Sequence, residues 1–419
     1  MSNALADDTV QIPDPYSMPL EDVNPLDAKL FQHDAQWAYF ERLRAEDPVH
    51  FSEDEEFGRY WHITKFEDIM LVEKHHDIFS SEGGITIGPP LNAPEDRLQT
   101  RMFIAMDPPT HDVQRATVSP VVQPINLAKL EGTIRERAGN ILDSLPIGET
   151  FNWVDLVSIE LTTQMLATLF DFPFEDRRKL TRWSDVATAA PGTIIENEEQ
   201  RKEELLECLA YFTKLWNERV NAEPGSDLIS MLAHGEETRN MDPMEFLGNL
   251  ILLIVGGNDT TRNSISGGVL ALNENPAEYD KLRADPSLIP NMVAEIIRWQ
   301  TPLAYMRRTA NVDTEIRGKK IKAGDRVLMW YVSGNRDDDV IENANDFIID
   351  RAKARHHVSF GFGIHRCMGN RLAEMQLRVL WEEIMKRFER IEVVQEPERI
   401  FSSFVKGYSE LMVRVHPKK

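Results

Sequence analysis

Over most of the chain, apolar side chains recur every three to four residues, the spacing that buries one face of an α-helix. This pattern predicts helices over residues 125–145, 154–171, 199–221, 243–273, 289–299 and 368–388. Signals for strands are fewer, and they cover residues 49–51 with 60–63 as a hairpin, residues 315–332 with breaks at Gly318 and Gly324, and residues 391–394 paired with 411–415. The sequence therefore predicts a mainly α-helical protein with a small number of strands.

The helix predicted over residues 243–273 has an unusual composition. Its first half is almost wholly apolar, which is typical of a helix inside a large core. It is then interrupted by Gly256-Gly257-Asn258-Asp259-Thr260-Thr261. Each glycine in a helix costs about 1 kcal/mol relative to alanine, and an ionisable residue in an apolar helix is also unfavourable. We therefore expect this polar break to serve a function.

Length and charge narrow the class of protein. The chain has 419 residues, of which 42% are hydrophobic, and this is enough to build a large core. We expect residues 1–25 to form a flexible N-terminal arm and residues 26–419 to form one catalytic domain, because no linker or repeat divides them. The net charge of −22 repels phosphate backbones and argues against nucleic-acid binding.

Neither the start of the chain nor its hydrophobic runs suggest secretion or a membrane anchor. The first eight residues lack the basic and apolar segments of a signal peptide. The longest apolar run, Leu250–Val255, is far shorter than the roughly 20 residues that cross a bilayer. Two cysteines, Cys208 and Cys367, are too few for a disulfide framework. We expect a cytoplasmic protein.

The most informative segment is the glycine-rich stretch Phe360-Gly361-Phe362-Gly363-Ile364-His365-Arg366-Cys367-Met368-Gly369. Its glycines permit tight turns and close approach of the backbone to a flat partner. Cys367 lies just before a helical pattern, where unpaired N–H groups and the helix dipole lower the pKa of a thiol. Arg366 adds positive potential. These features predict an ionised cysteine that acts as a nucleophile or a metal ligand, whereas Cys208 is interpreted as an inert helix residue.

The spacing Phe-x-x-Gly-x-His-x-Cys-x-Gly resembles the haem-binding loop of the cytochrome P-450 family, in which the cysteine is the proximal ligand of the haem iron. Further segments resemble landmarks of that family: Gly256–Thr261, Glu295–Arg298, Asn335–Asp337 and Phe347–Arg351. The resemblance covers about residues 30–419. It implies the cytochrome P-450 fold, a large helical domain around haem b with a smaller β-rich region. In that fold Cys367 binds the iron, and Phe360, His365 and Gly369 belong to the cofactor loop.

The resemblance also implies which side chains bind the two haem propionates. His111 and Arg115 are four residues apart and therefore share one helix face, and the family places such a pair against the propionates. Arg308 matches a third propionate-binding position, although its neighbour Arg307 remains an alternative. His365 is the fourth candidate.

In the family, the polar break in the long helix activates dioxygen. Gly256 leaves room beside the helix, and Thr260 can donate a hydrogen bond to the carbonyl of Gly256 four residues earlier. Asp259 is the acid that feeds protons inward. The alternative is a helix kink with a polar lining and no role in proton transfer. The resemblance further implies that Glu295, Arg298 and Arg351 form a structural ion cluster.

Candidate substrate-pocket residues come from several segments and are nearly all apolar: Ile85, Ile87, Met102, Phe103, Met106, Leu252, Val255, Leu303, Met306, Phe401 and Phe404. Such a lining predicts an apolar substrate. Residues 256–264 and 301–310 resemble the bacterial branch that hydroxylates chain ends. This implies terminal hydroxylation of medium-chain alkanes or fatty acids with dioxygen; the alternative is a bulkier terpene- or sterol-like substrate.

Electrons for such a reaction must come from another protein, because the chain has no Gly-x-Gly-x-x-Gly dinucleotide motif. The resemblance implies a [2Fe–2S] ferredoxin and its reductase as partners. A basic patch around Cys367 would dock an acidic ferredoxin. The predicted patch consists of Arg115, Arg355, Arg366, Arg371 and Arg378.

Three other functions remain open on the sequence. One is a haem-thiolate peroxygenase, but such enzymes lack an acid–threonine pair like Asp259-Thr260. The second is a non-catalytic haem-thiolate sensor, which would usually carry a signalling module. The third is a zinc protein built on His75-His76 or His356-His357, although their spacing matches no familiar zinc pattern.

Overall fold

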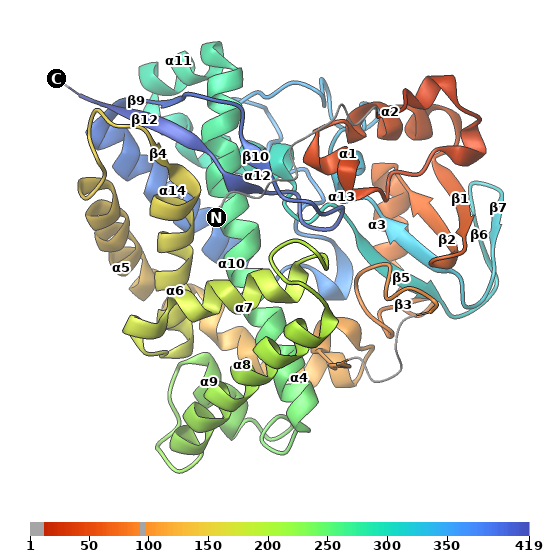
Figure 1. Cartoon of the computed structure of the whole chain (residues 1–419), viewed down its shortest axis with the longest axis horizontal. Coiled ribbons are helices and arrows are strands. Elements are labelled where there is room, and N and C mark those ends of the chain that lie inside the picture. Colours follow the sequence, from red (N-terminus) through yellow and green to blue (C-terminus); the bar gives the residue numbers. More distant parts are fainter. Residues whose placement is uncertain (1–11, 93–97, 419) are drawn as a thin grey trace.

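The computed structural model describes residues 12–92 and 98–418, which form a large helical region and a smaller region that holds most of the strands (Figure 1). The helices are α1 (Ala28–Gln32), α2 (Gln36–Glu46), α3 (Phe66–Lys74), α4 (Thr110–Val118), α5 (Pro124–Asp143), α6 (Glu160–Phe170), α7 (Arg178–Thr188), α8 (Glu198–Arg219), α9 (Leu228–His234), α10 (Pro243–Glu274), α11 (Pro276–Ala284), α12 (Ile289–Gln300), α13 (Tyr331–Gly334) and α14 (Asn370–Arg387). The prediction of a mainly α-helical protein is confirmed.

The helices predicted from the apolar spacing are present as α5, α6, α8, α10, α12 and α14. One differs in detail, because residues 154–171 form a π-helical turn over Val154–Ile159 before α6 begins. This wider turn packs on α10, where the hydroxyl oxygens of Ser158 and Ser266 are 2.8 Å apart. Helix α7 was not predicted, although its buried residues Leu180 and Trp183 already have helical spacing.

The strands are β1 (Val49–Asp54), β2 (Gly58–Ile63), β3 (Phe79–Ser80), β4 (Phe151–Asn152), β5 (Met306–Ala310), β6 (Thr314–Ile316), β7 (Lys319–Ile321), β8 (Arg326–Met329), β9 (Phe388–Val393), β10 (Glu398–Arg399), β11 (Tyr408–Glu410) and β12 (Met412–Pro417). The predicted hairpin is confirmed as the antiparallel pair β1–β2, with Val49 opposite Ile63. The predicted pairing near the C-terminus is the antiparallel pair β9–β12.

The largest sheet has the strand order β1-β2-β8-β5-β3 and lies on the right of Figure 1, next to α1, α2 and α3. Strand β8 runs parallel to β2, and β5 runs antiparallel to β8. Strand β5 was not predicted, because two of its five residues are arginines. This position matters for the site, since β5 carries Arg308 from the sheet toward the helical region.

Helix α10 crosses the centre of the helical region (Figure 1) and packs against α6, α7, α12 and α14. Its residues Leu247, Leu250 and Ile254 are at most 1% exposed. This burial confirms that the apolar first half of the predicted helix lies in a large core. The polar break is therefore held inside the protein.

The predicted flexible arm, residues 1–25, is only partly within the described residues, because residues 1–11 lie outside them. Residues 12–25 include both exposed side chains and some that pack on the rest of the protein. Val23 is completely buried, and Arg42 donates hydrogen bonds to the carbonyls of Pro15 and Met18. These hydrogen bonds attach the Pro- and Asp-rich segment to α2, which carries Arg42.

The structural ion cluster predicted at the end of α12 is present. Arg298 donates two hydrogen bonds to the Glu295 carboxylate, at 2.7 and 2.8 Å, and both side chains are fully buried. Arg351 donates a third at 3.0 Å. Arg298 also donates to the backbone carbonyls of residues 335, 344 and 346. The cluster thereby connects α12 to the chain that leads to the cysteine loop.

Within the described ranges, no helix combines the length and the apolar composition that crossing a bilayer requires.

Candidate active site

The cysteine loop is shaped by glycines and ends just before α14. The amide of Cys367 donates a 2.7 Å hydrogen bond to the carbonyl of Phe360, which closes the loop. Gly363 has a φ of +68°, and a Cβ there would lie 2.4 Å from the backbone oxygen of Glu73 on α3. Only glycine fits a left-handed backbone in such close contact. The loop is therefore held directly against the end of α3.

The Cys367 side chain is accessible, but the space that it reaches is an internal cavity. Burial inside the protein raises the pKa of its thiol, whereas hydrogen bonding to the amides of Gly369 and Asn370 opposes this rise. The prediction of a lowered thiol pKa is thus wrong for the protein alone, because loss of solvation outweighs the N–H groups. The amides nevertheless meet the sulfur as expected and would stabilise a thiolate once it is bound to a metal.

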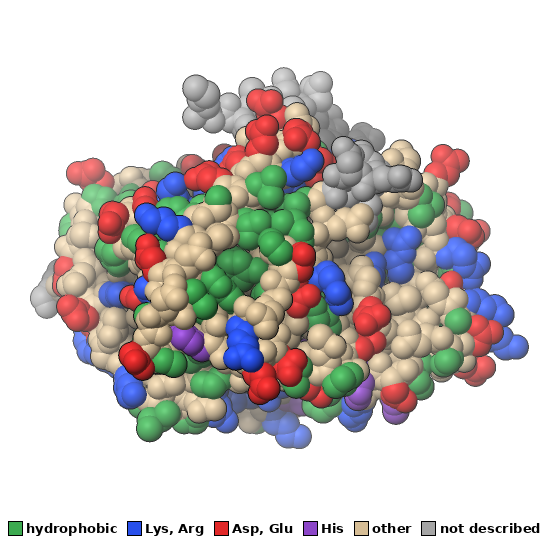
Figure 2. Space-filling model, turned by 90° about the horizontal axis from the view of Figure 1, so that it is seen from below, with side chains coloured by type: hydrophobic (Ala, Val, Ile, Leu, Met, Phe, Trp, Pro, Cys, Tyr) green, Lys and Arg blue, Asp and Glu red, His purple; other side chains and the backbone are tan. Residues whose placement is uncertain are grey.

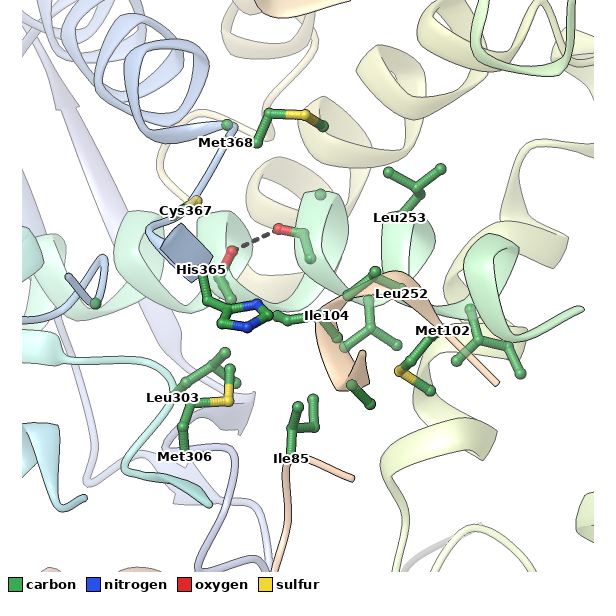
Figure 3. A pocket seen from close by; sticks show the side chains of 18 of the residues that line it. Ile85, Met102, Ile104, Leu252, Leu253, Leu303, Met306, His365, Cys367 and Met368 are labelled. Carbon is green, nitrogen blue, oxygen red and sulfur yellow. Dashed lines mark hydrogen bonds between the residues drawn. The ribbon is translucent and has the colours of Figure 1, made fainter. Parts of the chain in front are cut away.

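The cavity has a volume of about 860 Å³ and reaches from the cysteine loop to α10. Most of the candidate site residues line it: Ile85, Met102, Phe103, Met106, Arg115, Leu252, Val255, Gly256, Thr260, Leu303, Met306, Arg308, Phe360, His365, Cys367, Gly369 and Phe404. Figure 3 shows Cys367 and His365 at one side and apolar side chains from Ile85, Leu252 and Leu303 converging on the space beside them. The sequence therefore identified residues that are far apart in the chain and adjacent in the fold.

The polar break of α10 lines this cavity at four of its six positions, Gly256, Gly257, Thr260 and Thr261. The hydroxyl of Thr260 donates a 2.7 Å hydrogen bond to the carbonyl of Gly256, as predicted. A Cβ at Gly256 would meet no atom within 4 Å, so this glycine leaves open space along the helix. A dioxygen-sized molecule can therefore approach the backbone at the place where a hydroxyl proton is available.

Asp259 does not line the cavity and points to α7 instead. Its carboxylate accepts hydrogen bonds from Ser184 at 3.0 Å and from Thr188 at 3.4 Å, and it forms a 2.9 Å ion pair with Arg262. Burial raises the pKa of Asp259, and the positive charge of Arg262 opposes that rise. Asp259 thus reaches the cavity only through Thr188, which lines it.

The surroundings of His111 and His365 indicate whether the cavity suits a haem. The rings of His111 and His365 are 4.1 Å apart. His111 Nδ1 is 2.8 Å from an oxygen of Asp112 and His365 Nε2 is 2.8 Å from the hydroxyl of Ser81, but the other ring nitrogen of each is buried without a described partner. Buried nitrogens of this kind require an acceptor or a donor. A propionate reaching this pair would supply one, so the residues present fit haem.

His111 itself lies behind His365 and does not line the cavity. Burial lowers the pKa of His365 to about 2, with the positive charges of Arg308 and Arg115 adding to the effect. The ring is therefore neutral in the protein alone, and the positive charge beside it comes from Arg115 and Arg308. Arg115 lines the cavity and donates a hydrogen bond to the carbonyl of Arg366 on the cysteine loop.

The two adjacent arginines Arg307 and Arg308 point in different directions. Arg308 lines the cavity, whereas Arg307 turns to the backbone carbonyls of Glu82 and Ile87. Arg308 donates a 2.9 Å hydrogen bond to the buried carboxylate of Glu73, which also accepts one from the hydroxyl of Tyr331. Glu73 was not predicted from the sequence, and its carboxylate holds Arg308 in place at the cavity wall.

Replacing Glu73 by glutamine is expected to loosen Arg308 while leaving the volume of the side chain unchanged. Loss of a charge-assisted hydrogen bond costs about 1.5–3 kcal/mol locally, so we expect faster loss of haem and a changed reduction potential. Haem transfer to an excess of apomyoglobin measures the rate of haem loss, and a redox titration measures the reduction potential. Glu67→Gln on the exposed side of α3 is the matched control. An equal rate of haem loss from the native protein, Glu73→Gln and Glu67→Gln would contradict this role for Glu73.

Two substrate-pocket predictions are wrong. Ile87 is buried in a core cluster with Tyr305 and Trp330 and does not line the cavity, because the chain bends between residues 85 and 88 and separates the directions of Ile85 and Ile87. Phe401 lies in a turn after β10 and also stays outside the cavity. Phe404, three residues later, lines it and packs on Tyr305 at 5.5 Å.

Some lining residues were missed. Ile104 and Leu253 lie next to predicted residues in apolar runs that could have suggested them (Figure 3). The loop that contains Ile104 is fixed to α10, because the amide of Phe103 donates a 2.9 Å hydrogen bond to Asn249. For Thr188, no pattern in the sequence suggests that it lines the cavity.

Figure 2 shows a recess of hydrophobic side chains with a charged rim on one face, a pattern typical of the mouth of a ligand site.

The zinc alternative has no ligand cluster in the described part of the chain, where no group of three or more His, Cys, Asp or Glu side chains is arranged to hold a metal ion. His356 packs on Phe66 and His357 packs on Phe360. The two adjacent rings thus have separate packing partners.

Comparison with known proteins agrees with this site. The family model described as Cytochrome P-450 matches residues 140–415. The structure of Cytochrome P-450-153 from Novosphingobium aromaticivorans is 47% identical and has a TM-score of 0.89, covering 94% of this chain and 99% of that one.

Curated relatives agree as well. Linalool 8-monooxygenase from Pseudomonas putida is 36% identical over 396 residues, which are 90% of this chain and 95% of that protein. Methyl-branched lipid omega-hydroxylase from Mycobacterium tuberculosis is 32% identical over 414 residues, which are 95% of this chain and 96% of that protein. The cavity between Cys367 and Thr260 and these likenesses lead to one conclusion: the chain belongs to the cytochrome P-450 family and is a monooxygenase whose cofactor is haem b.

Proposed function

We propose that this enzyme hydroxylates the terminal carbon of medium-chain alkanes or fatty acids. The observation that carries the proposal is the apolar lining of the cavity. The 860 Å³ cavity includes the cysteine loop and the side chains that we assign to the propionates, so haem takes a part of it. The remainder lies between apolar side chains and suits a hydrocarbon chain.

The haem, when bound, supplies the activation of dioxygen, and the protein contributes binding and proton transfer. The side chains that offer apolar contacts to the substrate chain include Met102, Ile104, Leu252, Leu303 and Met306 (Figure 3). These contacts exclude water from the space beside Cys367. The arrangement supports oxidation at the chain end.

Thr260 is the proton donor that we assign at the cavity wall. Its hydroxyl donates a hydrogen bond to the carbonyl of Gly256, and rotation of the hydroxyl would let it donate into the cavity instead. Behind it, the Asp259 carboxylate is connected to the cavity by the hydroxyl of Thr188. We propose that protons pass from Asp259 through Thr188 and ordered water to Thr260.

The substrate class is tested by titrating the ferric enzyme with a panel of ligands and recording the spin-state shift. Linear alkanes and fatty acids of about the same carbon number are compared with linalool and with a steroid. We expect saturable shifts with the linear ligands and terminal alcohols as products. A shift with only the bulky ligands would favour the second candidate, a terpene- or sterol-like substrate, which the likeness to linalool 8-monooxygenase supports.

We further propose a [2Fe–2S] ferredoxin, with its reductase, as the electron donor of a cytoplasmic enzyme. The basic patch is smaller than the sequence predicts. Arg378 forms ion pairs with Glu131 and Glu382, and Arg355 pairs with Glu374. Arg115 is inside the haem cavity. Of the five predicted arginines, only Arg366 and Arg371 are exposed and without a described ion-pair partner.

Reversing the charge of Arg371 is therefore expected to weaken the encounter with an acidic ferredoxin. Arg371→Glu should slow reduction by the ferredoxin by about tenfold or more at low salt, and the difference should shrink as salt screens the charges. Stopped-flow reduction measures the rate. Lys320→Glu on the β6–β7 ribbon is the control, since it changes charge equally away from Cys367. Equal rates for both variants, or no dependence on salt, would contradict the proposed docking site.

A further inference from the structure

A second cavity, of about 310 Å³, shares no lining residue with the haem cavity. Its wall is formed by the start of α2, the C-terminal part of α10, the end of α12 and the segment around β10 and β11. Its charged lining side chains are Asp34, Glu274, Arg336, Arg399 and Lys406. Its volume is at the lower end of the roughly 300–1,000 Å³ that is usual for small-molecule sites.

Arg336 is the most unusual group in this cavity. It is 5% exposed, and its guanidinium carbon lies 3.4 Å from the ring centroid of Trp299 and 4.5 Å from that of Trp37. These cation–π contacts involve the aromatic faces and leave the N–H donors free. Among the described residues, no oxygen accepts a hydrogen bond from this side chain and no carboxylate pairs with it. A buried guanidinium without an acceptor is unfavourable.

The other charges around the cavity do not compensate Arg336. Arg399 pairs with Glu396 at 2.8 Å and with Asp34 at 3.8 Å. Asp34 already accepts hydrogen bonds from Trp37 at 3.0 Å and from Gln36 at 3.1 Å. The remaining carboxylate, Glu274, has no described hydrogen bond. Glu396 thus provides the near partner of Arg399, and both hydrogen bonds to Asp34 end on its Oδ1, so neither carboxylate of the lining is a described partner of Arg336.

Lys406 shares the indole of Trp37 with Arg336, because its Nζ lies 5.4 Å from that ring centroid. Its one described acceptor is the carbonyl of Gln300, at 3.1 Å. Burial lowers the pKa of Lys406 to about 8; the carboxylates of Asp34 and Glu274 oppose this lowering, and the charges of Arg336 and Arg399 add to it. The cavity thus holds two neighbouring cations, Arg336 and Lys406, whose hydrogen-bond donors are not saturated.

We propose that this cavity binds an oxyanion, the phosphate or carboxylate group of a small molecule, between the guanidinium of Arg336 and the ammonium of Lys406. The planar N–H donors of a guanidinium match the paired oxygens of such groups. The indoles of Trp37 and Trp299 would cover the faces of the guanidinium. A metal cation would be repelled by the three positive side chains, and an apolar ligand would leave them unpaired. The site is separate from the haem cavity and goes beyond the monooxygenase function.

The proposal is tested by thermal unfolding of the holoenzyme with inorganic phosphate and, separately, with succinate, chloride keeping the ionic strength constant. A ligand that binds only the folded state raises the unfolding midpoint in a saturable way. Phosphate binding is also measured by equilibrium dialysis. We expect saturation with at least one of the two anions, and their comparison distinguishes a phosphate from a carboxylate ligand.

Two variants locate the site. Arg336→Gln and Lys406→Gln should each weaken binding of the anion by about tenfold or more, the effect of losing one charged hydrogen bond. Lys129→Gln, at an exposed position of α5, should bind like the native protein. If Arg336→Gln fails to fold, Lys406→Gln alone tests whether the anion binds in this cavity. The proposal is overturned if neither anion gives a saturable shift, or if Lys406→Gln binds as tightly as the native enzyme.

Discussion

Replacing Glu295 by alanine is expected to destabilise the protein by about 3–5 kcal/mol, the usual cost of leaving one member of a buried ion pair without its partner. The change leaves the guanidinium of Arg298 buried with only backbone carbonyls as acceptors. It also removes the 3.0 Å hydrogen bond from Arg351. Because this cluster connects α12 to the segment before the cysteine loop, haem should be lost at lower denaturant concentration as well. Urea unfolding followed by fluorescence and by the Soret band measures both.

The matched control is Glu199→Ala, which removes an exposed partner of Lys202 on α8. An exposed pair contributes little, so this variant should unfold close to the native midpoint. Equal midpoints for the two variants would refute the structural role of Glu295.

The same cluster predicts a loss of stability in acid. Although burial opposes ionisation, contact with Arg298 and Arg351 holds the pKa of Glu295 below its ordinary value of 4.5. A group with a lowered folded-state pKa stabilises the protein fully above its ordinary value, and this contribution is lost as the pH falls through the lower value. The native protein should therefore lose stability below about pH 4.5, and Glu295→Ala should lose less over the same range.

Replacing Thr260 by valine is the second change with a large expected effect. Valine keeps the shape of the side chain but removes the hydroxyl that bonds to Gly256. Proton transfer by a positioned group contributes roughly 10²- to 10⁴-fold, so product formation should fall by about 100-fold while electrons continue to be consumed. Hydrogen peroxide released for each NAD(P)H oxidised, set against product formed, measures this loss of coupling.

Thr260→Ser is the control, because serine retains a hydroxyl at the same position and should restore most of the coupling. Substrate affinity should change little in both variants, since the hydroxyl is not part of the apolar wall. Native coupling in Thr260→Val would show that the hydroxyl has no part in proton delivery. It would favour the alternative reading of the break in α10 as a simple polar kink.

The sequence predicted those parts of the structure that depend on local patterns. The apolar first half of α10, the hairpin β1–β2 and the loop that ends at Cys367 each carry their signal within a few residues, through spacing, turns and glycines. The resemblance to a known family then placed His365, Arg308 and Thr260 around one cavity. The structure confirms that they share its wall.

What the sequence could not predict depends on contacts between distant segments. Glu73 meets Arg308 across 235 positions of the chain, and no local pattern marks that pairing. Asp259 turns toward α7, where Ser184 donates to its carboxylate, while Arg262, one turn further along α10, pairs with it; no local pattern predicts that direction. Ile87 has the same apolar character as Ile85, and only the bend between them separates core from pocket.

The central claim is that the thiolate of Cys367 is the axial ligand of the haem iron. The most direct test is the carbon monoxide difference spectrum of the dithionite-reduced protein, recorded for the native enzyme, Cys208→Ser and Cys367→His. The native enzyme and Cys208→Ser should show the long-wavelength Soret band of a thiolate-ligated haem, and Cys367→His should lose it. A native spectrum with the shorter-wavelength band of imidazole-ligated haem would contradict the assignment of Cys367.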